Sequence, residues 1–285
     1  MATADRGWAF AWRKALAGAV LGLVAWTAQA NIFVTDRRQQ SDASLPPLRS
    51  VGLLHHAEAG VGGTAFLIGA CHALTAHHVA FPQDLAAAAG RAGGGRASKA
   101  QFLVGADPAR PGQFASRSRV RVVAKGRFSD ADYAGMAGDW ALLKLEVCLG
   151  RQYGFLKLGR VAADSPMPTG TLMVAGYPRS RAHLPGITVE RGCRARDHGP
   201  VNGLVGIDCA FESGMSGAPV LEHQRGRGWQ VVGMVQQTLG SVDGILPDYS
   251  MLHRNQMLSV SAFRKEVEDA LRAEARRVLP PPGAR

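Results

Sequence analysis

The sequence predicts an all-β protein with a single helix near its C-terminal end. Short apolar or alternating runs recur at fairly regular spacing, and Gly, Pro, Asp or Asn residues bound most of them. This pattern is typical of β-barrels and β-sandwiches. With 285 residues, the chain is long enough for one large β-domain or two smaller ones. The expected strands are residues 50–54, 63–68, 71–75, 101–105, 120–125, 140–145, 171–176, 187–192, 203–208, 218–221 and 229–235.

Two segments depart from the strand pattern. Residues 85–98, LAAAAGRAGGGRAS, are rich in Ala and Gly, which predicts a helical turn that runs into a surface loop. Residues 261–277, SAFRKEVEDALRAEARR, have a helical apolar period and begin with Ser261, a suitable N-cap. The apolar face of this helix would consist of Phe263, Val267, Ala270 and Leu271. We expect the helix to dock on the β-structure and a frayed tail to follow it.

The first thirty residues have the pattern of an export signal. Basic residues precede the apolar run ALAGAVLGLVAW, and Ala28 and Ala30 occupy the small-residue positions that a signal peptidase requires. The run is short for a membrane span. We therefore expect residues 1–30 to be cleaved and the remaining chain to be secreted or periplasmic, without a membrane segment. An uncleaved anchor is the alternative.

Export makes disulfides the default state of the cysteines. Cys71, Cys148, Cys193 and Cys209 allow three pairings, and their spacing does not choose between them. The four residues are too far apart for the paired short spacings of a structural zinc site. The stretch CHALTAHHVA also lacks the glutamate and the helical context of a zinc protease. We expect neither a metal site nor a cofactor.

The chain is basic, with a formal net charge of +11, which makes nucleic acid a partner to consider. The best support for it is RSRVRVVAKGR, where Arg117, Arg119 and Arg121 alternate with Ser and Val. This alternation is typical of a strand with one charged, solvated face. No aromatic residues interleave with the arginines to stack on bases. We therefore favour a solvated strand face and expect no nucleic-acid partner.

Three stretches contain the parts of a nucleophilic site. CHALTAHHVA carries three histidines, the side chain best suited to move protons near neutral pH. GDWALLKLE places Asp139 just before an apolar strand, which is costly for a carboxylate without a partner. ESGMSGAPVL places Ser216 between glycines. A serine nucleophile needs a base that accepts its proton, and the base needs a carboxylate to orient it. Gly214 lets the backbone turn so that its N–H and that of Ser216 point at a developing oxyanion.

In this order, the three stretches resemble the motifs of the chymotrypsin-like serine peptidases. ALTAHHVA is similar to the histidine motif and places the base at His78, with His77 in a small-residue position. DWALLKL and GMSGAPV resemble the aspartate and nucleophile motifs. NIFVTDRR and LRSVGLL make the bacterial branch that includes the glutamyl endopeptidases the closer match. The resemblance covers the chain from about residue 32 to about residue 270.

The resemblance implies two six-stranded antiparallel β-barrels, with His78 and Asp139 from the first and Ser216 from the second. It also implies a serine endopeptidase that acts on protein or peptide substrates through an acyl-enzyme, and we expect a monomer. The expected division of the chain is a signal peptide at 1–30, an N-terminal extension at 31–48, a first barrel at 49–150, a second barrel at 151–258, and a helix and tail at 259–285.

Several residues depart from the family pattern. Met215 stands where animal digestive members keep an aspartate that pairs with the newly cut N-terminus. Gln236 and Gln237 replace the usual serine and tryptophan on the strand that binds the substrate backbone. The acid-binding threonine and histidine of the glutamyl branch correspond to Phe211 and Val235, so we expect no preference for glutamate.

In this family the residue six before the nucleophile forms the floor of the specificity pocket, and the strand after the nucleophile forms its wall. The expected lining is Ala210, Phe211, Val235, Gln236, Gln237 and Thr238. None of these side chains is charged, so small or medium apolar substrate side chains should bind and basic ones should bind poorly. Glu212 and the loop GSVDGILPD are the alternatives that would supply a negative charge.

Among the alternatives to a peptidase are an α/β-hydrolase and a binding protein. An α/β-hydrolase would take its triad from Ser216, Asp248 and His253, but Ala218 replaces the glycine of its nucleophile motif. A binding protein on a silenced protease scaffold would normally have lost a triad residue, and none is lost here.

Export and the positions of the cysteines suggest a disulfide hypothesis. Cys193 would pair with Cys209 ahead of the nucleophile loop, and Cys71 with Cys148 near the histidine and aspartate strands.

Overall fold

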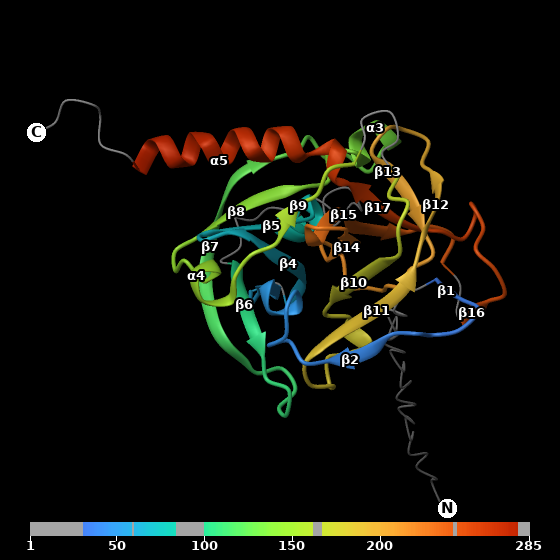
Figure 1. Ribbon diagram of the computed structural model, residues 1–285, viewed down its shortest axis with the longest axis horizontal. Helices are drawn as coiled ribbons and strands as arrows, with labels where there is room; N and C mark the ends of the chain where they lie inside the picture. The colour runs from blue at the N-terminus through green and yellow to red at the C-terminus, as the bar shows by residue number, and fades with distance from the viewer. Residues whose placement is uncertain (1–30, 59, 84–99, 162–166, 242–243, 279–285) are drawn as a thin grey trace, which may run out of the picture.

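The computed structural model describes residues 31–58, 60–83, 100–161, 167–241 and 244–278. Two curved β-structures lie next to one another, and helix α5 (Arg264–Val278) lies along the outside of the first (Figure 1). The expected export signal at 1–30 and the expected helical turn and loop at 85–98 lie outside the described residues.

Within the described residues, six strands close the first β-structure into a barrel in the order β3-β4-β5-β8-β7-β6. The strands are β3 (Val51–His56), β4 (Val61–Gly69), β5 (His72–Thr75), β6 (Ala100–Ala106), β7 (Phe114–Lys125) and β8 (Ala141–Leu145). Neighbouring strands are antiparallel throughout. Strand β6 alternates buried and half-buried residues, as expected for a strand with one face toward a core.

The second β-structure is a sheet that contains nine strands in the described part of the chain. Its order is β12-β13-β17-β15-β14-β10-β11-β2, and β9 pairs with β15. Only Arg194 separates β11 (Ile187–Cys193), which is next to the edge strand β2, from β12 (Ala195–His198) at the other edge, so the chain connects the two sides of the sheet and curls it into a second barrel. The other members are β2 (Gln39–Ser41), β9 (Lys157–Leu158), β10 (Leu172–Gly176), β13 (Leu204–Ile207), β14 (Pro219–Gln224), β15 (Gly228–Thr238) and β17 (Asn255–Ser259).

The all-β fold class with two barrels and a C-terminal helix is confirmed, and the second barrel is more elaborate than six strands. Strands β2 and β9 are short and have no apolar alternation of their own. They satisfy backbone groups at the edges of β11 and β15, which a sequence pattern does not reveal. A further pair, β1 (Ile32–Phe33) with β16 (Ile245–Leu246), is parallel. The remaining short helices are η1 (Leu48–Ser50), α1 (His77–Ala80), α3 (Tyr133–Met136), α4 (Gly150–Tyr153), η2 (Arg179–Arg181) and η3 (Val260–Ala262).

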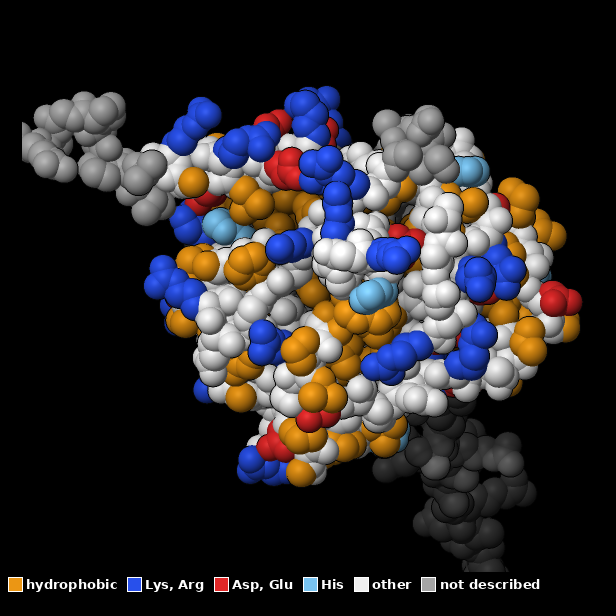
Figure 2. Space-filling model, in the orientation of Figure 1, with side chains coloured by type: hydrophobic (Ala, Val, Ile, Leu, Met, Phe, Trp, Pro, Cys, Tyr) orange, Lys and Arg blue, Asp and Glu red, His pale blue; other side chains and the backbone are white. Residues whose placement is uncertain are grey.

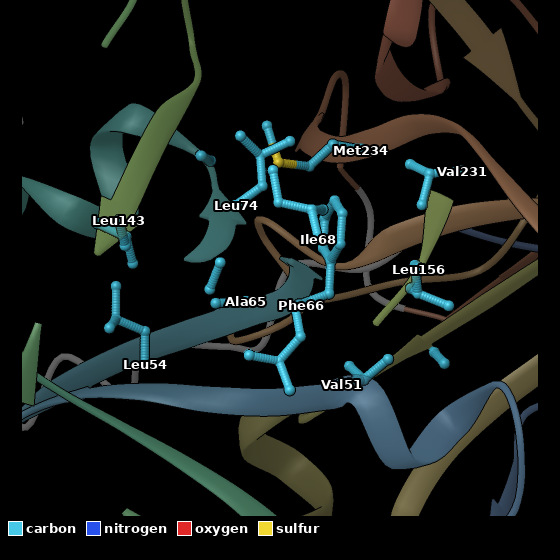
Figure 3. Packing of buried hydrophobic residues seen from close by; sticks show 14 of the residues in the cluster. Val51, Leu54, Ala65, Phe66, Ile68, Leu74, Leu143, Leu156, Val231 and Met234 are labelled. Atoms are coloured by element: carbon cyan, nitrogen blue, oxygen red, sulfur yellow. The ribbon is translucent and has the colours of Figure 1, made fainter. Parts of the chain in front are cut away.

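One hydrophobic cluster joins the two barrels. Val51, Phe66 and Leu74 of the first barrel belong to the same buried cluster as Val231 and Met234 of β15 (Figure 3). A second cluster fills the interior of the second barrel and includes the half-cystines Cys193 and Cys209. Burial of this apolar surface, at about 25 cal/mol per Å², fixes the position of one barrel on the other. A site built from both barrels therefore has a rigid base.

Helix α5 docks on the first barrel through Phe263 and Val267, which are fully buried at or beside its first turns. The carboxylate of Glu274 then accepts from Lys144 of β8 (2.7 Å) and Arg121 of β7 (3.1 Å). Ser261 is not the N-cap of this helix, because the residue lies in the 3-10 turn η3 and α5 begins only at Arg264.

Disulfides join Cys71 to Cys148 and Cys193 to Cys209 in the described part of the chain, as the hypothesis required. The sequence separations are 77 and 16 residues. The chain-entropy relation gives about 4.5 kcal/mol for the longer loop and about 3 kcal/mol for the shorter one. The first disulfide joins Cys148, which follows β8, to Cys71, which directly precedes β5, the strand that leads to His78.

The arginines of β7 lie on a solvated face, as expected: Arg117, Arg119 and Arg121 are all exposed. Basic side chains are spread over the face in Figure 2, including the outer side of α5, rather than gathered in a single patch. Among the described residues, no helix is both long enough and apolar enough to cross a membrane.

Candidate active site

His78 and Asp139 form a buried pair on the first barrel. Strand β5 ends at Thr75, and after the extended residue Ala76 the chain enters α1, with His78 as its second residue. Asp139 stands two residues before β8 and is 1% exposed. Its Oδ2 atom lies 2.9 Å from Nδ1 of His78, and its Oδ1 atom accepts the backbone N–H of His78 at 3.1 Å. The carboxylate thus fixes both the main chain and the ring of the histidine.

The pair also sets the basicity of the imidazole. Burial disfavours the charged form of His78, but the charge of Asp139 and its hydrogen bond outweigh that effect and raise the pKa of His78 above its ordinary value. With Nδ1 held by the carboxylate, the opposite ring nitrogen, Nε2, is the atom left to exchange a proton.

His77 has a different environment from its neighbour. Its ring is 4% exposed, lies 4.8 Å from the ring of Phe81 and 5.4 Å from that of Phe128, and its Nδ1 atom lies 3.2 Å from the carbonyl oxygen of Gly126. These contacts assign His77 a packing role in the first barrel.

The turn that carries Asp139 is supported from the second barrel. The side-chain amide of Gln236 donates to the carbonyl of Met136 at 2.6 Å, and that carbonyl also accepts the N–H of Asp139 at 3.2 Å. The side-chain oxygen of Gln236 accepts from Gln256 at 2.7 Å. A glutamine therefore positions the aspartate through its backbone, without touching the carboxylate.

Ser216 lies in a tight loop between β13 and β14. Within this loop, the N–H of Met215 donates to Glu212 O (2.9 Å) and the N–H of Ala218 to Met215 O (2.9 Å). Gly214 has φ of 98°, and a Cβ atom there would lie 2.5 Å from the carbonyl oxygen of Tyr177. Only glycine fits both the backbone conformation and the close approach.

The amides of Gly214 and Ser216 are available to a ligand. In the described ranges, neither N–H donates a hydrogen bond to a protein acceptor. The carbonyls of the same loop are occupied instead: Ser213 O accepts from Arg179 N (2.8 Å), and the carbonyls of Gly214 and Ser216 both accept from Thr64. A loop with bound carbonyls and free amides is what stabilisation of a developing oxyanion requires.

Thr64 of β4 joins the first barrel to this loop. Its N–H donates to Ser216 O and its Oγ1 to Gly214 O, both at 2.9 Å, and Oγ1 accepts the N–H of Tyr177 at 3.1 Å. Sequence reasoning missed Thr64, because nothing in the pattern of β4 distinguishes it from other buried strand residues.

His78 and Ser216 open into one cavity of about 330 Å³ between the barrels. In the described structure, Oγ of Ser216 donates to Gln236 O at 3.4 Å, and no hydrogen bond joins it to His78. Such contacts are often long without substrate and shorten when the substrate binds. The cavity is lined by His78, Phe128, Asp130, Met136, Asp139, Phe211, Glu212, Ser213, Ser216, Gln236, Gln237 and Thr238.

The predicted pocket residues divide into two groups. Phe211, Gln236, Gln237 and Thr238 line the cavity, whereas Ala210 and Val235 are buried and are not among its lining residues. The pairing of β15 with β17 is irregular between Val235 and Gln237. Such a bulge re-aims side chains along a strand, so counting residues did not give the directions of these side chains.

Two acidic residues, Glu212 and Asp130, line the cavity, although the expected pocket lining contained no charged side chain. Glu212 borders the cavity, but its carboxylate binds Arg38 and Ser180 and supplies no free charge. Asp130 also lines the cavity and is exposed, and no hydrogen bond to its side chain is present among the described residues. The sequence analysis missed Asp130, because no motif marks the loop after β7 that holds it.

A group of potential metal ligands occurs away from the cavity. Among the described residues, the ligand atoms of Cys193, Asp208 and Cys209 lie close together. The two sulfurs are joined in the disulfide, and the carboxylate binds the backbone of Arg194 and the side chain of Arg196. As arranged, these three residues have no free ligand atom for a metal ion.

Two barrels with a buried histidine–aspartate pair beside a serine in a glycine-bounded loop define the chymotrypsin-like peptidase fold. The chain belongs to the trypsin-like peptidase family, because the family model for the trypsin-like peptidase domain matches residues 63–234. A solved structure of a Glu endopeptidase in complex with MPD is similar, with a TM-score of 0.63 over 85% of this chain and 99% of that one. Sequence identity is 16%, so that likeness concerns the fold. A comparison with curated proteins finds no significant match. The resemblance inferred from the sequence is thereby confirmed.

The loop geometry predicts the cost of a side chain at Gly217. Its φ is 81°, and a Cβ would lie 2.3 Å from Thr64 O and 2.4 Å from Thr75 Oγ1. Backbone strain and overpacking together should lower the free energy of unfolding of Gly217→Ala by about 2–5 kcal/mol. Gly226→Ala is a matched control, since φ is 73° and a Cβ there meets nothing within 4 Å. It should cost only about 1–2 kcal/mol. Equal losses in urea denaturation would contradict the close approach of Thr64 to the loop.

Proposed function

We propose that the protein is a serine endopeptidase that hydrolyses peptide bonds through a triad of Ser216, His78 and Asp139. The observation that supports it most is the placement of a serine, an aspartate-bound histidine and two free backbone amides at one cavity. Family membership supports hydrolysis of peptide bonds as the reaction class.

In the proposed reaction, Oγ of Ser216 attacks the carbonyl carbon of the scissile bond while Nε2 of His78 accepts its proton. Asp139 keeps Nδ1 protonated and stabilises the imidazolium that forms. The N–H groups of Gly214 and Ser216 stabilise the negative charge on the carbonyl oxygen. His78 then protonates the leaving amine, and a water molecule, deprotonated by the same nitrogen, hydrolyses the acyl-enzyme. The residues used supply every proton transfer, so the mechanism requires no cofactor.

We also propose that the mature chain works outside the cytoplasm, in the periplasm or the medium. Two disulfides support this setting, since they persist in oxidising compartments. The substrates would be proteins or peptides.

The first test separates the two adjacent histidines. His78→Ala should lower kcat for a peptide substrate by about 10⁴-fold or more, because the base is lost. His77→Ala removes packing against Phe81 and Phe128, so it should lower thermal stability and leave kcat within about threefold at a temperature where it is folded. Steady-state kinetics and thermal denaturation of both variants show which of the two histidines is the base and which serves packing. Full activity in His78→Ala would refute the role of His78 as the base, and an inactive parent chain would leave the alternative of a silenced binding protein.

The second test uses pH. Only neutral His78 accepts a proton, so kcat/KM should fall as pH drops through the pKa of His78 in the free enzyme. Asp139 raises that pKa, and the acidic limb should lie above the ordinary histidine value of about 6.5. Asp139→Asn removes the charge, which should move the limb to lower pH and reduce kcat by about 10⁴-fold. A limb that does not move in Asp139→Asn would show that another group controls it.

The third test concerns the residue before the cleaved bond. Because Glu212 is bound to Arg38, a basic side chain beside Phe211 would lose hydration without gaining a counter-ion there. We expect cleavage of a peptide library mainly after small or medium apolar residues. Dominant cleavage after Arg or Lys would refute this, and Asp130→Asn would then show whether Asp130 provides the negative charge.

A further inference from the structure

The N-terminal segment reaches the nucleophile loop through a buried ion pair. Arg38 stands just before β2, and its Nη1 atom donates to Oε2 of Glu212 at 2.9 Å. The two side chains are 5% and 4% exposed, although they are 174 residues apart in the chain. A buried charge without its partner is strongly unfavourable. The position of Glu212 therefore depends on Arg38.

Arg38 is itself held firmly. Its Nε and Nη2 atoms each donate to Asp36 at 2.8 Å, and its carbonyl oxygen accepts from Arg181 at 3.1 Å. Arg181 also donates to Asp36 at 2.8 Å. Burial works against the charged form of Asp36, but the hydrogen bonds and charges of the arginines outweigh it and hold the pKa of Asp36 at about 2. Asp36 therefore stays charged down to strongly acidic pH.

The neighbouring arginine holds the start of the same loop. Arg37 donates to Glu190 at 3.1 Å, and the second oxygen of Glu190 accepts the N–H of Ala210 at 2.6 Å. The second oxygen of Glu212 accepts from both the N–H and the hydroxyl of Ser180. Residues 210 and 212 are thus anchored by side chains from outside the loop.

Anchoring at Glu212 is transmitted to the free amides. The carbonyl of Glu212 accepts the N–H of Met215, which closes the turn that contains Gly214 and leads to Ser216. Met215 is fully buried in the core of the second barrel and has no charge to attract a partner. The loop therefore takes its ionic anchor at Glu212, three residues earlier.

We infer that Arg38 is a positioning residue, whose ion pair with Glu212 holds the loop of residues 210–216 so that the amides of Gly214 and Ser216 face the cavity. The role in catalysis rests on the proposed function. The anchor is a side chain rather than a chain terminus, so it forms whatever precedes residue 31. Residues 36–41 accordingly belong to the working enzyme and are not a segment to be removed.

The test compares Arg38→Gln, Arg38→Lys and Glu212→Gln with a matched control. Lys144→Gln is the control, because Lys144 also pairs with a 4% exposed carboxylate, that of Glu274, but on the first barrel away from the cavity. Hydrogen–deuterium exchange of residues 209–217 is measured first, since it does not depend on activity. Arg38→Gln and Glu212→Gln should exchange these amides at least tenfold faster, with β3–β5 unchanged, and Lys144→Gln should match the parent.

Kinetics of the same proteins give the second measurement. Arg38→Gln should lose about 10²-fold in kcat with KM within about threefold, the size expected when an oxyanion donor is misplaced. Arg38→Lys keeps the charge and should recover at least tenfold of the loss. The inference would be overturned if Arg38→Gln had the exchange rates of the parent and a kcat within twofold of the parent value. It would also be overturned if Lys144→Gln changed the exchange rates and kcat as much as Arg38→Gln does. If Arg38→Gln does not fold, Glu212→Gln decides by the same criteria. A parent chain without peptidase activity would refute the proposed function, while the exchange rates still decide whether Arg38 holds the loop.

Discussion

The rest of the structure depends on the hydrogen bonds by which Thr64 of the first barrel holds the Ser216 loop of the second barrel. His78 and Asp139 come from the first barrel and Ser216 from the second, so the site exists only if the barrels meet in one relative position. Thr64 is completely buried, and its N–H and hydroxyl bind the carbonyls of Ser216 and Gly214. These bonds turn the loop so that its amides are free. The shared cluster of Phe66, Leu74 and Met234 supplies the apolar contact that keeps this junction dry (Figure 3).

Charge is distributed unevenly around the cavity. Two of its acids have partners: Asp139 accepts a hydrogen bond from His78 and Glu212 forms an ion pair with Arg38, and each carboxylate is almost inaccessible to water. Met215 contributes apolar packing where animal relatives have a carboxylate. Gln236, which stands in place of the family's usual serine, supports the backbone ahead of Asp139 through its side-chain amide. The same requirements of the site are thus met by different side chains.

Much of the fold, and the placement of His78, Asp139 and Ser216 at one cavity, could be predicted because they depend on local patterns. His78, Asp139 and Ser216 each occur at a strand end with distinctive neighbours, and the strands have short-range alternation. The ion pair of Arg38 with Glu212 could not be predicted, since neither residue stands in a motif and both lie far apart in sequence. Ala210 and Val235 were expected in the pocket by counting, but both are buried and do not line the cavity, and β15 has an irregularity next to Val235. Backbone position is predictable from a family pattern, and side-chain direction is not.

The most direct test of Ser216 as an activated nucleophile is covalent labelling of the purified mature chain with a fluorophosphonate, followed by mass spectrometry of its peptides. Such a probe reacts with a serine whose hydroxyl is activated by a base and whose adduct is stabilised by backbone amides. We expect one adduct, on Ser216, and we expect it to be lost when the chain is unfolded before labelling. No adduct on the folded chain, or an adduct on another serine, would contradict the claim that the two barrels assemble an active nucleophile at this position.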